Sequence, residues 1–328
     1  MAAFLPGGTR RSILALGLAA TSVLAQAQSD FPRKPIRLVV PYAPGGAIDV
    51  MARPIAQRSS ELMGQPVLVD NRPGANATLG ADIVARSPAD GYTILFNSVV
   101  HDLVPYFLKN VPYNAVKDFT YIANIGTTPN ILAVHPSIPA HNMQELLDYA
   151  RKNPGKMFYG TTGTGSTHHL GGVLLAQLTN IPFEHVPYKG GNPTINDALA
   201  GQIPIVILTA PTIMPFAKEG KLRPLAVIEG RRYKSTGTLP SIGETVPGYA
   251  VPELWLGVLG PAGIPRPVLE RLNAVLRQAA NTPEVKQPLE NFGFEITATA
   301  NVDEFSASAK ADLAKFVKII QAAGIKPE

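Results

Sequence analysis

The chain has 328 residues, enough for about two domains, and 45% of them are hydrophobic, which excludes a disordered chain. Only 16% are charged, the net charge is +5, and no long basic run gathers that excess, so the composition argues against a nucleic-acid partner. The absence of cysteine excludes disulfides, thiolate nucleophiles and cysteine-ligated metals.

The first thirty residues have the pattern of an export signal. Two arginines precede an apolar run from residue 13 to residue 25, and Ala25-Gln26-Ala27 is an A-x-A cleavage site. The run is too short to cross a bilayer as a helix, which needs about 20 residues. We therefore predict a signal peptide over residues 1–27 and a mature chain outside the cytoplasmic membrane. Arg10-Arg11 leaves both the Sec and the twin-arginine route open.

In chain order, the mature sequence alternates short apolar runs with segments of helical periodicity. The predicted strands are 36–40, 67–69, 92–96, 131–134, 157–159, 183–186, 205–208 and 225–228, with a further apolar run at 254–259. The predicted helices are 47–63, 79–86, 142–152, 169–179, 194–200, 214–219, 267–280 and 303–323. This alternation is typical of α/β domains with mainly parallel sheets.

Two glycine-rich loops follow predicted strands and open predicted helices. They are Pro41–Gly46 and Gly160–Ser166, where Ser166 is a natural N-cap. A helix N-terminus offers unpaired N–H groups and the positive end of the helix dipole, and glycine lets a ligand approach the backbone. Such a loop binds carboxylate or phosphate without a basic side chain. Ordinary tight turns remain an alternative for either loop, but the pair favours anion binding.

Several catalytic and cofactor patterns are absent. The chain has no Walker A motif, no complete dinucleotide fingerprint and no nucleophile elbow. Adjacent histidines such as His168 and His169 do not share a helix face, so we predict no metal and no cofactor. Ser166 and His169 could form the nucleophile and base of an exported hydrolase, but no carboxylate is placed to orient the histidine, and an N-cap hydroxyl is the preferred interpretation.

Longer motifs resemble a known family. They include Pro41-x-x-x-Gly45-Gly46-x-x-Asp49, Asn71-Arg72-Pro73-Gly74-Ala75, Tyr159-Gly160-Thr161-x-Gly163-x-Gly165-Ser166-x-x-His169-Leu170, His185-Val186-Pro187-Tyr188-Lys189-Gly190-Gly191 and Trp255-x-Gly257. Together they resemble the extracytoplasmic solute receptors of tripartite tricarboxylate transporters, also called Bug proteins. The resemblance covers essentially the whole mature chain.

The resemblance implies an α/β fold of the type II periplasmic binding protein kind, with two Rossmann-like lobes around a ligand cleft. Lobe 1 would comprise residues 30–130 and 253–328, and lobe 2 residues 131–252. The implied protein is a monomeric receptor and no enzyme. It would capture a di- or tricarboxylate or an aromatic acid and deliver it to the integral membrane subunits of the transporter. A receptor that signals to a membrane sensor kinase is the alternative.

The family's binding residues carry over by position. In lobe 1 they are Tyr42, Ala43, Pro44, Gly45, Gly46 and Asp49, with Ser98 and His101 after a later strand. In lobe 2 they are Thr161, Thr162, Gly163, Thr164, Gly165, Ser166 and His169, with Thr209 after a later strand. Two places where relatives often carry an acidic residue, at residues 201–204 and 208–211, lack one here. That departure favours a plain organic acid over an amino acid.

Overall fold

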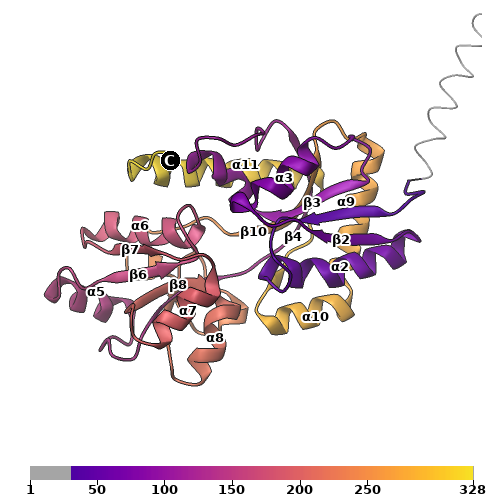
Figure 1. Cartoon of the computed structure of the whole chain (residues 1–328). Coiled ribbons are helices and arrows are strands. Elements are labelled where there is room, and N and C mark those ends of the chain that lie inside the picture. The colour runs from indigo at the N-terminus through magenta and orange to yellow at the C-terminus, as the bar shows by residue number, and fades with distance from the viewer. Residues whose placement is uncertain (1–30, 328) are drawn as a thin grey trace, which may run out of the picture.

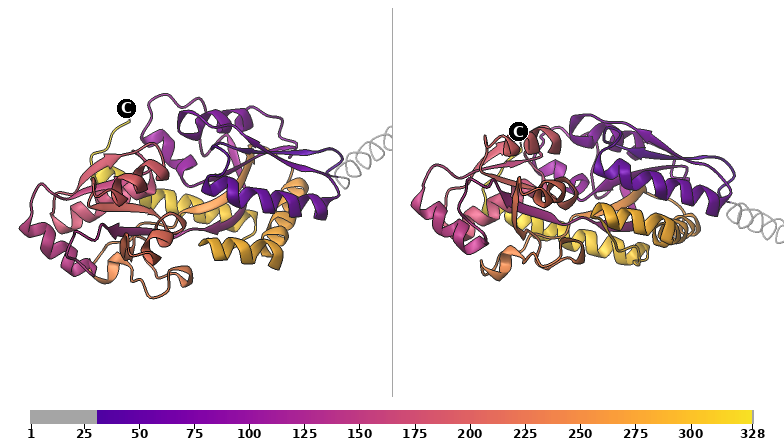
Figure 2. Two further views of the ribbon diagram at one scale, coloured as in Figure 1. Left: turned by 60° about the horizontal axis from the view of Figure 1, so that its bottom comes forward. Right: turned by 90° about the horizontal axis from the view of Figure 1, so that it is seen from below.

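The computed structural model describes residues 31–327 and shows two lobes, each built on its own β-sheet (Figure 1). The predicted signal peptide lies outside the described residues. In further views the lobes lie side by side and the long helix α11 (Val302–Ala322) extends from lobe 1 toward lobe 2 (Figure 2). No helix among residues 31–327 combines the length and the apolar character that a membrane span requires.

The sheet of lobe 1 has six strands in the order β11-β4-β10-β3-β1-β2. Their bounds are β1 Ile36–Val40, β2 Val67–Asn71, β3 Thr93–Ser98, β4 Phe119–Thr127, β10 Trp255–Pro261 and β11 Glu295–Ile296. The helices of this lobe besides α11 are α2 Ala47–Met63, α3 Thr78–Ala85, α4 Val100–Leu103, α9 Arg266–Asn281 and α10 Pro283–Phe292. Side chains alternate along β1 between two cores: Leu38 packs with α2 and α9, and Val39 packs with α3 and α11.

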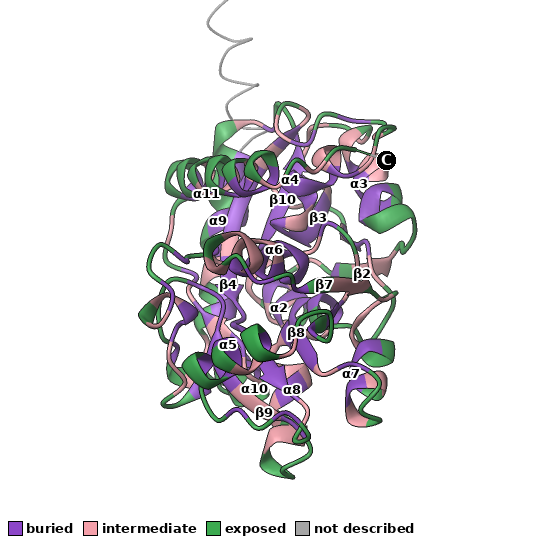
Figure 3. Cartoon of the chain, turned by 90° about the vertical axis from the view of Figure 1, so that its left-hand side faces the viewer, coloured by how far each residue is buried: buried purple, intermediate pink, exposed green. Residues whose placement is uncertain are grey.

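The sheet of lobe 2 has five strands in the order β7-β6-β8-β5-β9. Their bounds are β5 Asn130–Val134, β6 Phe158–Thr161, β7 Glu184–Pro187, β8 Ile205–Thr209 and β9 Arg223–Val227. The helices are α5 Met143–Lys152, α6 Thr167–Thr179, α7 Gly191–Leu199 and α8 Ala210–Lys218. The central strands of both sheets are buried and the edge strands β2 and β7 are mostly not, whereas α5 and α11 turn exposed residues outward (Figure 3).

The prediction of mainly parallel sheets is wrong, because both sheets are mixed. β1 is parallel to β2 and β3, and β6 is parallel to β7 and β8. β10 and β5, however, are antiparallel to both of their neighbours. These two strands enter their sheets from the other lobe, so each starts at the lobe boundary, where the parallel strands end.

The chain passes between the sheets twice, through segments of very different length. Between β4 and β5 lie only Thr128 and Pro129, whereas residues 228–254 separate β9 from β10. A further connection comes from α11, whose Phe316 and Ile320 share a core with Leu170 of α6. The lobes are therefore joined by a short crossover, a long crossover and a packed helix.

Candidate functional site

The strand register brings both glycine-rich loops to the boundary between the lobes. Thr209, at the end of β8, pairs with Asn130 beside the short crossover. Ser98, at the end of β3, pairs with Leu256, the second residue after the long crossover. Because β1 runs parallel to β3 and β6 runs parallel to β8, the loops after β1 and β6 reach the same boundary. Ligands of α/β proteins lie at such carboxyl ends.

The lobes touch one another around this boundary. A Cβ at Gly165 of lobe 2 would lie 2.8 Å from Cγ of Phe107 in lobe 1, and the Phe107 ring lies edge-on to His169 at 6.3 Å between centroids. A Cβ at Gly293 of lobe 1 would lie 3.1 Å from Cγ of Pro211 in lobe 2. The lobes are therefore in contact beside the second glycine-rich loop, at the boundary that both loops reach.

Asp49 holds the first loop in place. Its buried carboxylate accepts hydrogen bonds from Gly45 N at 2.9 Å, from Arg53 Nε at 2.8 Å and from Asn71 Nδ2 at 2.8 Å. Burial alone would raise the pKa of Asp49, but the hydrogen bonds from Arg53, Gly45 and Asn71 outweigh it and hold the pKa below its usual value. The carboxylate of Asp49, a predicted binding residue, is thus hydrogen-bonded within the protein, and its role is to shape the loop.

The first loop presents backbone to the boundary. Residues 43–47 are exposed, and no side chain caps α2 at Gly46, whose φ of −71° and ψ of 163° are extended. Tyr42 forms the wall behind it: the Tyr42 hydroxyl donates to Asn97 Oδ1 at 3.0 Å, and its carbonyl accepts from Asn71 Nδ2. The start of α2 is therefore open for an anion to use its N–H groups.

The second loop is closed on itself by hydroxyl groups. Ser166 Oγ accepts from His169 N at 3.1 Å and donates to Gly163 O at 2.7 Å, so the predicted N-cap is confirmed. Thr161 is fully buried, and its hydroxyl contacts His185 Nε2 at 2.7 Å. Gly163 and Gly165 have φ values of +133° and +84°, which side chains disfavour. Thr161 therefore supports the loop from behind, and Thr164 is its exposed tip.

His169 offers a neutral donor beside this loop. Its Nδ1 accepts from Gly165 N at 3.3 Å, so Nε2 carries the ring hydrogen. Burial lowers the pKa of His169 to about 4, and the ring stacks on His185 at 4.1 Å. Nε2 of His169 has no hydrogen-bond partner among the described residues, which leaves it available to a ligand oxygen.

A hydrogen-bonded chain runs from the second loop into the lobe. Thr162 Oγ1 lies 3.0 Å from His168 Nδ1, and His168 Nε2 lies 2.8 Å from Asn130 Oδ1. Asn130 Nδ2 donates to Glu229 Oε1 at 2.8 Å. Asn130 and Glu229 are fully buried, and burial raises the pKa of Glu229 to about 8.

Three predicted binding residues have other tasks in the structure. His101 is 1% exposed; its Nε2 contacts Ala115 O at 3.1 Å and its ring stacks on Tyr113, so it belongs to the core of lobe 1 and presents no surface to a ligand. Ser98 is also buried, and its hydroxyl accepts from Val100 N. Thr209 precedes α8 and shares a hydrogen bond with Thr212.

The hydrolase alternative lacks its geometry. Among the described residues Ser166 Oγ bonds only to backbone groups, and the Nδ1 of His169 is occupied by Gly165 N, so no hydrogen bond joins the hydroxyl to the imidazole. Within residues 31–327 no group of three or more histidine and acidic side chains could hold a metal.

Sequence reasoning missed residues that complete the site. Phe107 and Asn71 belong to it through tertiary contacts alone, and no local pattern at Phe107 predicts that contact. Asn71 and His185, however, belong to the motifs quoted above, and those motifs could have indicated that both residues lie at the site. Asn130 and Glu229 lie 99 positions apart, and nothing in the sequence links them.

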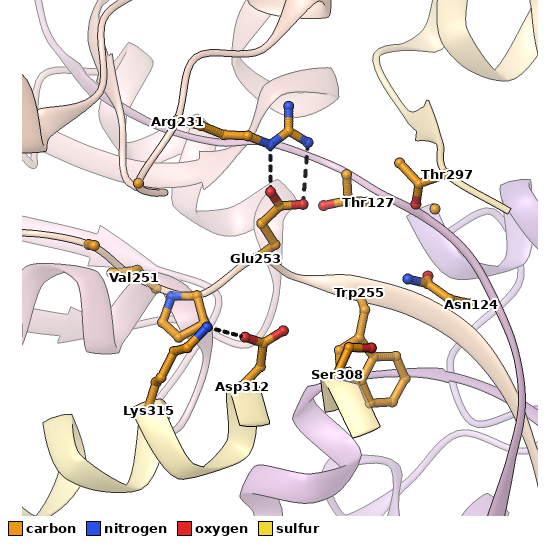
Figure 4. Close-up of a pocket in the computed structure, with 14 residues that line it drawn as sticks. Asn124, Thr127, Arg231, Val251, Glu253, Trp255, Thr297, Ser308, Asp312 and Lys315 are labelled. Carbon is orange, nitrogen blue, oxygen red and sulfur yellow. Dashed lines mark hydrogen bonds and ion pairs between the residues drawn. The ribbon is translucent and has the colours of Figure 1, made fainter. Parts of the chain in front are cut away.

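A cavity of about 510 Å³ lies at the crossovers (Figure 4), and no residue of the glycine-rich loops lines it. Its lining combines β4, the long crossover and α11, and two ion pairs lie along it, Arg231 with Glu253 and Lys315 with Asp312. Arg231 also reaches Glu295 of lobe 1 at 3.3 Å. The charges of this cavity are therefore already paired within the protein.

The family described as "Tripartite tricarboxylate transporter family receptor" matches residues 51–325. A relative from Pseudomonas sp. (strain P51), the UPF0065 protein in the tcbD-tcbE intergenic region, is 36% identical over 317 residues, 95% of this chain and 94% of the relative. Rpa4515 of R. palustris, solved with adipate, has a TM-score of 0.82 and 33% identity over 91% of this chain and 100% of that chain. MatC from Rhodopseudomonas palustris, solved with bound malate, has a TM-score of 0.77 and 25% identity over 88% of this chain and 100% of that chain.

Proposed function

The chain belongs to the receptor family of tripartite tricarboxylate transporters, and on that premise we propose that it is a periplasmic solute receptor for a small organic carboxylate. It captures the acid between its lobes and delivers it to the membrane subunits of a transporter. The family is one of receptors, so no chemistry on the ligand is expected.

The observation that carries the proposal is the pair of loops at the lobe boundary. The exposed, uncapped start of α2 and the loop before α6 reach one boundary from opposite lobes. Each loop opens a helix and so lies at the positive end of its dipole, the start of α2 has no side-chain cap on its first N–H groups, and His169 adds a neutral donor. These groups donate hydrogen bonds, and neither loop presents an unpaired carboxylate that would repel a negative charge. The arrangement therefore suits an anionic ligand.

Two relatives support a dicarboxylate within that class. Rpa4515 was solved with adipate and MatC with malate, and both acids carry two carboxylates. We propose that one carboxylate of the ligand lies against Gly45 and Gly46, and that Gly163 to Ser166 and His169 close over it from lobe 2. The boundaries of the lobes would be those predicted, near residues 130 and 253, and binding would draw the lobes together.

A thermal-shift screen tests this function. The mature chain is unfolded and refolded once to remove any bound ligand, then heated with mono-, di- and tricarboxylates, aromatic acids, amino acids and amides at about 1 mM. A ligand at about 1,000 times its Kd adds about 4 kcal/mol to the free energy of unfolding, which is a clear rise in Tm. We expect the largest rise with a dicarboxylate. A rise with amides and none with any of the acids would contradict the proposal.

A further inference from the structure

In the hydrogen-bonded series Thr162–His168–Asn130–Glu229, the donor and the acceptor of each hydrogen bond can be identified. Glu229 Oε1 receives two N–H groups of Asn130, the backbone N at 3.1 Å and Nδ2 at 2.8 Å. The amide nitrogen of Asn130 therefore faces Glu229, and its Oδ1 faces His168. Because Oδ1 can only accept, His168 Nε2 at 2.8 Å must carry the hydrogen.

That direction determines what Thr162 can do. Burial lowers the pKa of His168 to about 4, so its ring is neutral and its Nδ1 has no hydrogen. Thr162 Oγ1, at 3.0 Å from Nδ1, must then be the donor. The only hydrogen of the Thr162 hydroxyl points into the lobe, and its oxygen has only lone pairs left for the boundary side.

The same chain ties the loop to both crossovers. Asn130 is the first residue of β5, directly after Thr128 and Pro129. Glu229 lies two residues after β9, where the long crossover begins, and Ile228 N donates to Asn130 O at 3.0 Å. A displacement of either crossover therefore reaches Thr162 through side chains that are buried and hydrogen-bonded in sequence.

We propose that His168, Asn130 and Glu229 are positioning residues of the binding loop, which hold Thr162 as a hydrogen-bond acceptor and fix the start of α6 to the crossovers. A carboxylate then takes its donors from the backbone and from His169, and none from Thr162. This role rests on the proposed function for its meaning, but its test needs no ligand, so a failed carboxylate screen and a failed network give different results.

The tautomer of His168 is the first measurement. Nitrogen-15 spectra of the histidine rings are recorded on the ligand-free full chain, and the His168 signals are assigned by their loss in His168→Gln. We expect Nε2 protonated and Nδ1 bare, unchanged from about pH 5 to pH 9. A hydrogen on Nδ1, or titration near pH 6.5, would reverse the chain and overturn the proposal. The tautomer itself is measured on the wild type, and the variant serves only to assign the signals.

A matched pair of variants removes the hydrogen bonds of the His168 ring one at a time. Asn places its amide oxygen where Nδ1 lies, and Gln places its amide nitrogen where Nε2 lies. His168→Gln thus removes the acceptor for Thr162, and His168→Asn removes the donor to Asn130. By hydrogen exchange we expect residues 160–167 to exchange about tenfold faster in His168→Gln, and residues 128–134 to respond in His168→Asn, since a lost hydrogen bond is worth about tenfold.

Controls separate positioning from packing. Thr162→Val removes the donor itself and should match His168→Gln, whereas Thr162→Ser keeps it and should behave as wild type. His141→Gln changes an exposed histidine and should leave both segments alone. Equal changes in both segments for both His168 variants would mean that the ring only fills space, and would overturn the proposal.

Discussion

At the scale of single residues, Gly165 has two separate reasons to be glycine. Its φ is +84°, and a Cβ there would lie 2.8 Å from the ring of Phe107 in the other lobe. We expect Gly165→Ala to lower carboxylate affinity about tenfold or more, because the new methyl group keeps the lobes apart. The affinity is measured by titration with the acid that the screen selects.

Gly155 provides the matched control for that variant. Its φ of +74° is similar, but no atom lies within 4 Å of its Cβ position. Gly155→Ala should cost a comparable amount of stability, about 1 kcal/mol, and leave affinity unchanged. If both variants bind the acid as the wild type does, the contact between Gly165 and Phe107 has no part in binding.

Glu229 makes stability depend on pH. Burial raises its pKa from 4.5 to about 8, with a smaller contribution from Glu253. The folded state therefore holds a proton that the unfolded chain has lost between these values. Its contribution to stability is complete below pH 4.5 and disappears as the pH rises through about 8, with a slope of at most about 1.4 kcal/mol per pH unit.

Glu229→Gln should flatten that dependence. Denaturant unfolding of the two proteins is compared from about pH 6.5 to pH 8. The buried histidines have lowered pKa values in the folded state but titrate near pH 6.5 when unfolded, and this contribution is shared by both proteins and cancels in the difference between them. We expect the wild type to lose stability relative to the variant across this window. Parallel curves would mean that Glu229 is ionised in the folded protein throughout.

At the scale of elements, α6 begins at a cap that also shapes the loop. Ser166→Ala removes an acceptor for His169 N and a donor to Gly163 O, so we expect a loss of about 1 kcal/mol in stability together with weaker carboxylate binding.

Asn142 caps α5 through Glu145 N in the same manner, away from the boundary. Asn142→Ala should cost similar stability in denaturant unfolding without changing affinity, and equal affinity in both variants would confine Ser166 to capping.

Elements with strong local signals could be predicted from the sequence, and others could not. The strand Ile36–Val40 and the helix Ala47–Met63 have their predicted bounds, because a buried apolar run and a helix ended by Gly64 are local features. The strand Phe119–Thr127 and the helix Pro283–Phe292 were not predicted. The first is stabilised by pairing with β10, more than a hundred residues later, and the second has Pro288 in its interior.

The candidate site divides in the same way. Loops that follow strands and open helices are visible in a sequence, and both lie at the lobe boundary. The direction in which a side chain points is not visible, because burial decides it. Asp49, Thr161 and His101 were predicted as ligand contacts, yet the first two support the loops from inside and the third lies in the core.

At the scale of the whole molecule, Phe107 and Gly165 allow the lobes to be linked covalently. The Cβ position of Gly165 lies 3.3 Å from Cβ of Phe107, close to the range of about 3.5–4.5 Å found in disulfides, and the chain has no cysteine to interfere. In Phe107→Cys/Gly165→Cys we expect oxidation to hold the lobes together. Small-angle scattering should then give the same radius with and without the acid, and exchange of bound acid should be slow.

Reduction is the control for that variant, since it should restore both exchange and any change of radius. If the oxidised protein binds and releases the acid at the rate of the reduced protein, the ligand does not enter through the contact between Phe107 and Gly165.

The placement of β10 has a consequence for the order in which the lobes are completed. Lobe 2 takes its whole sheet from one continuous stretch, from Asn130 to Val227, so that sheet can form as soon as this stretch is available. In lobe 1, β10 lies between β3 and β4 and arrives only with residues 255–261. Until then β3 and β4 have no common neighbour, and their open edges can pair wrongly. The lobe that begins the chain is therefore the lobe that finishes folding last.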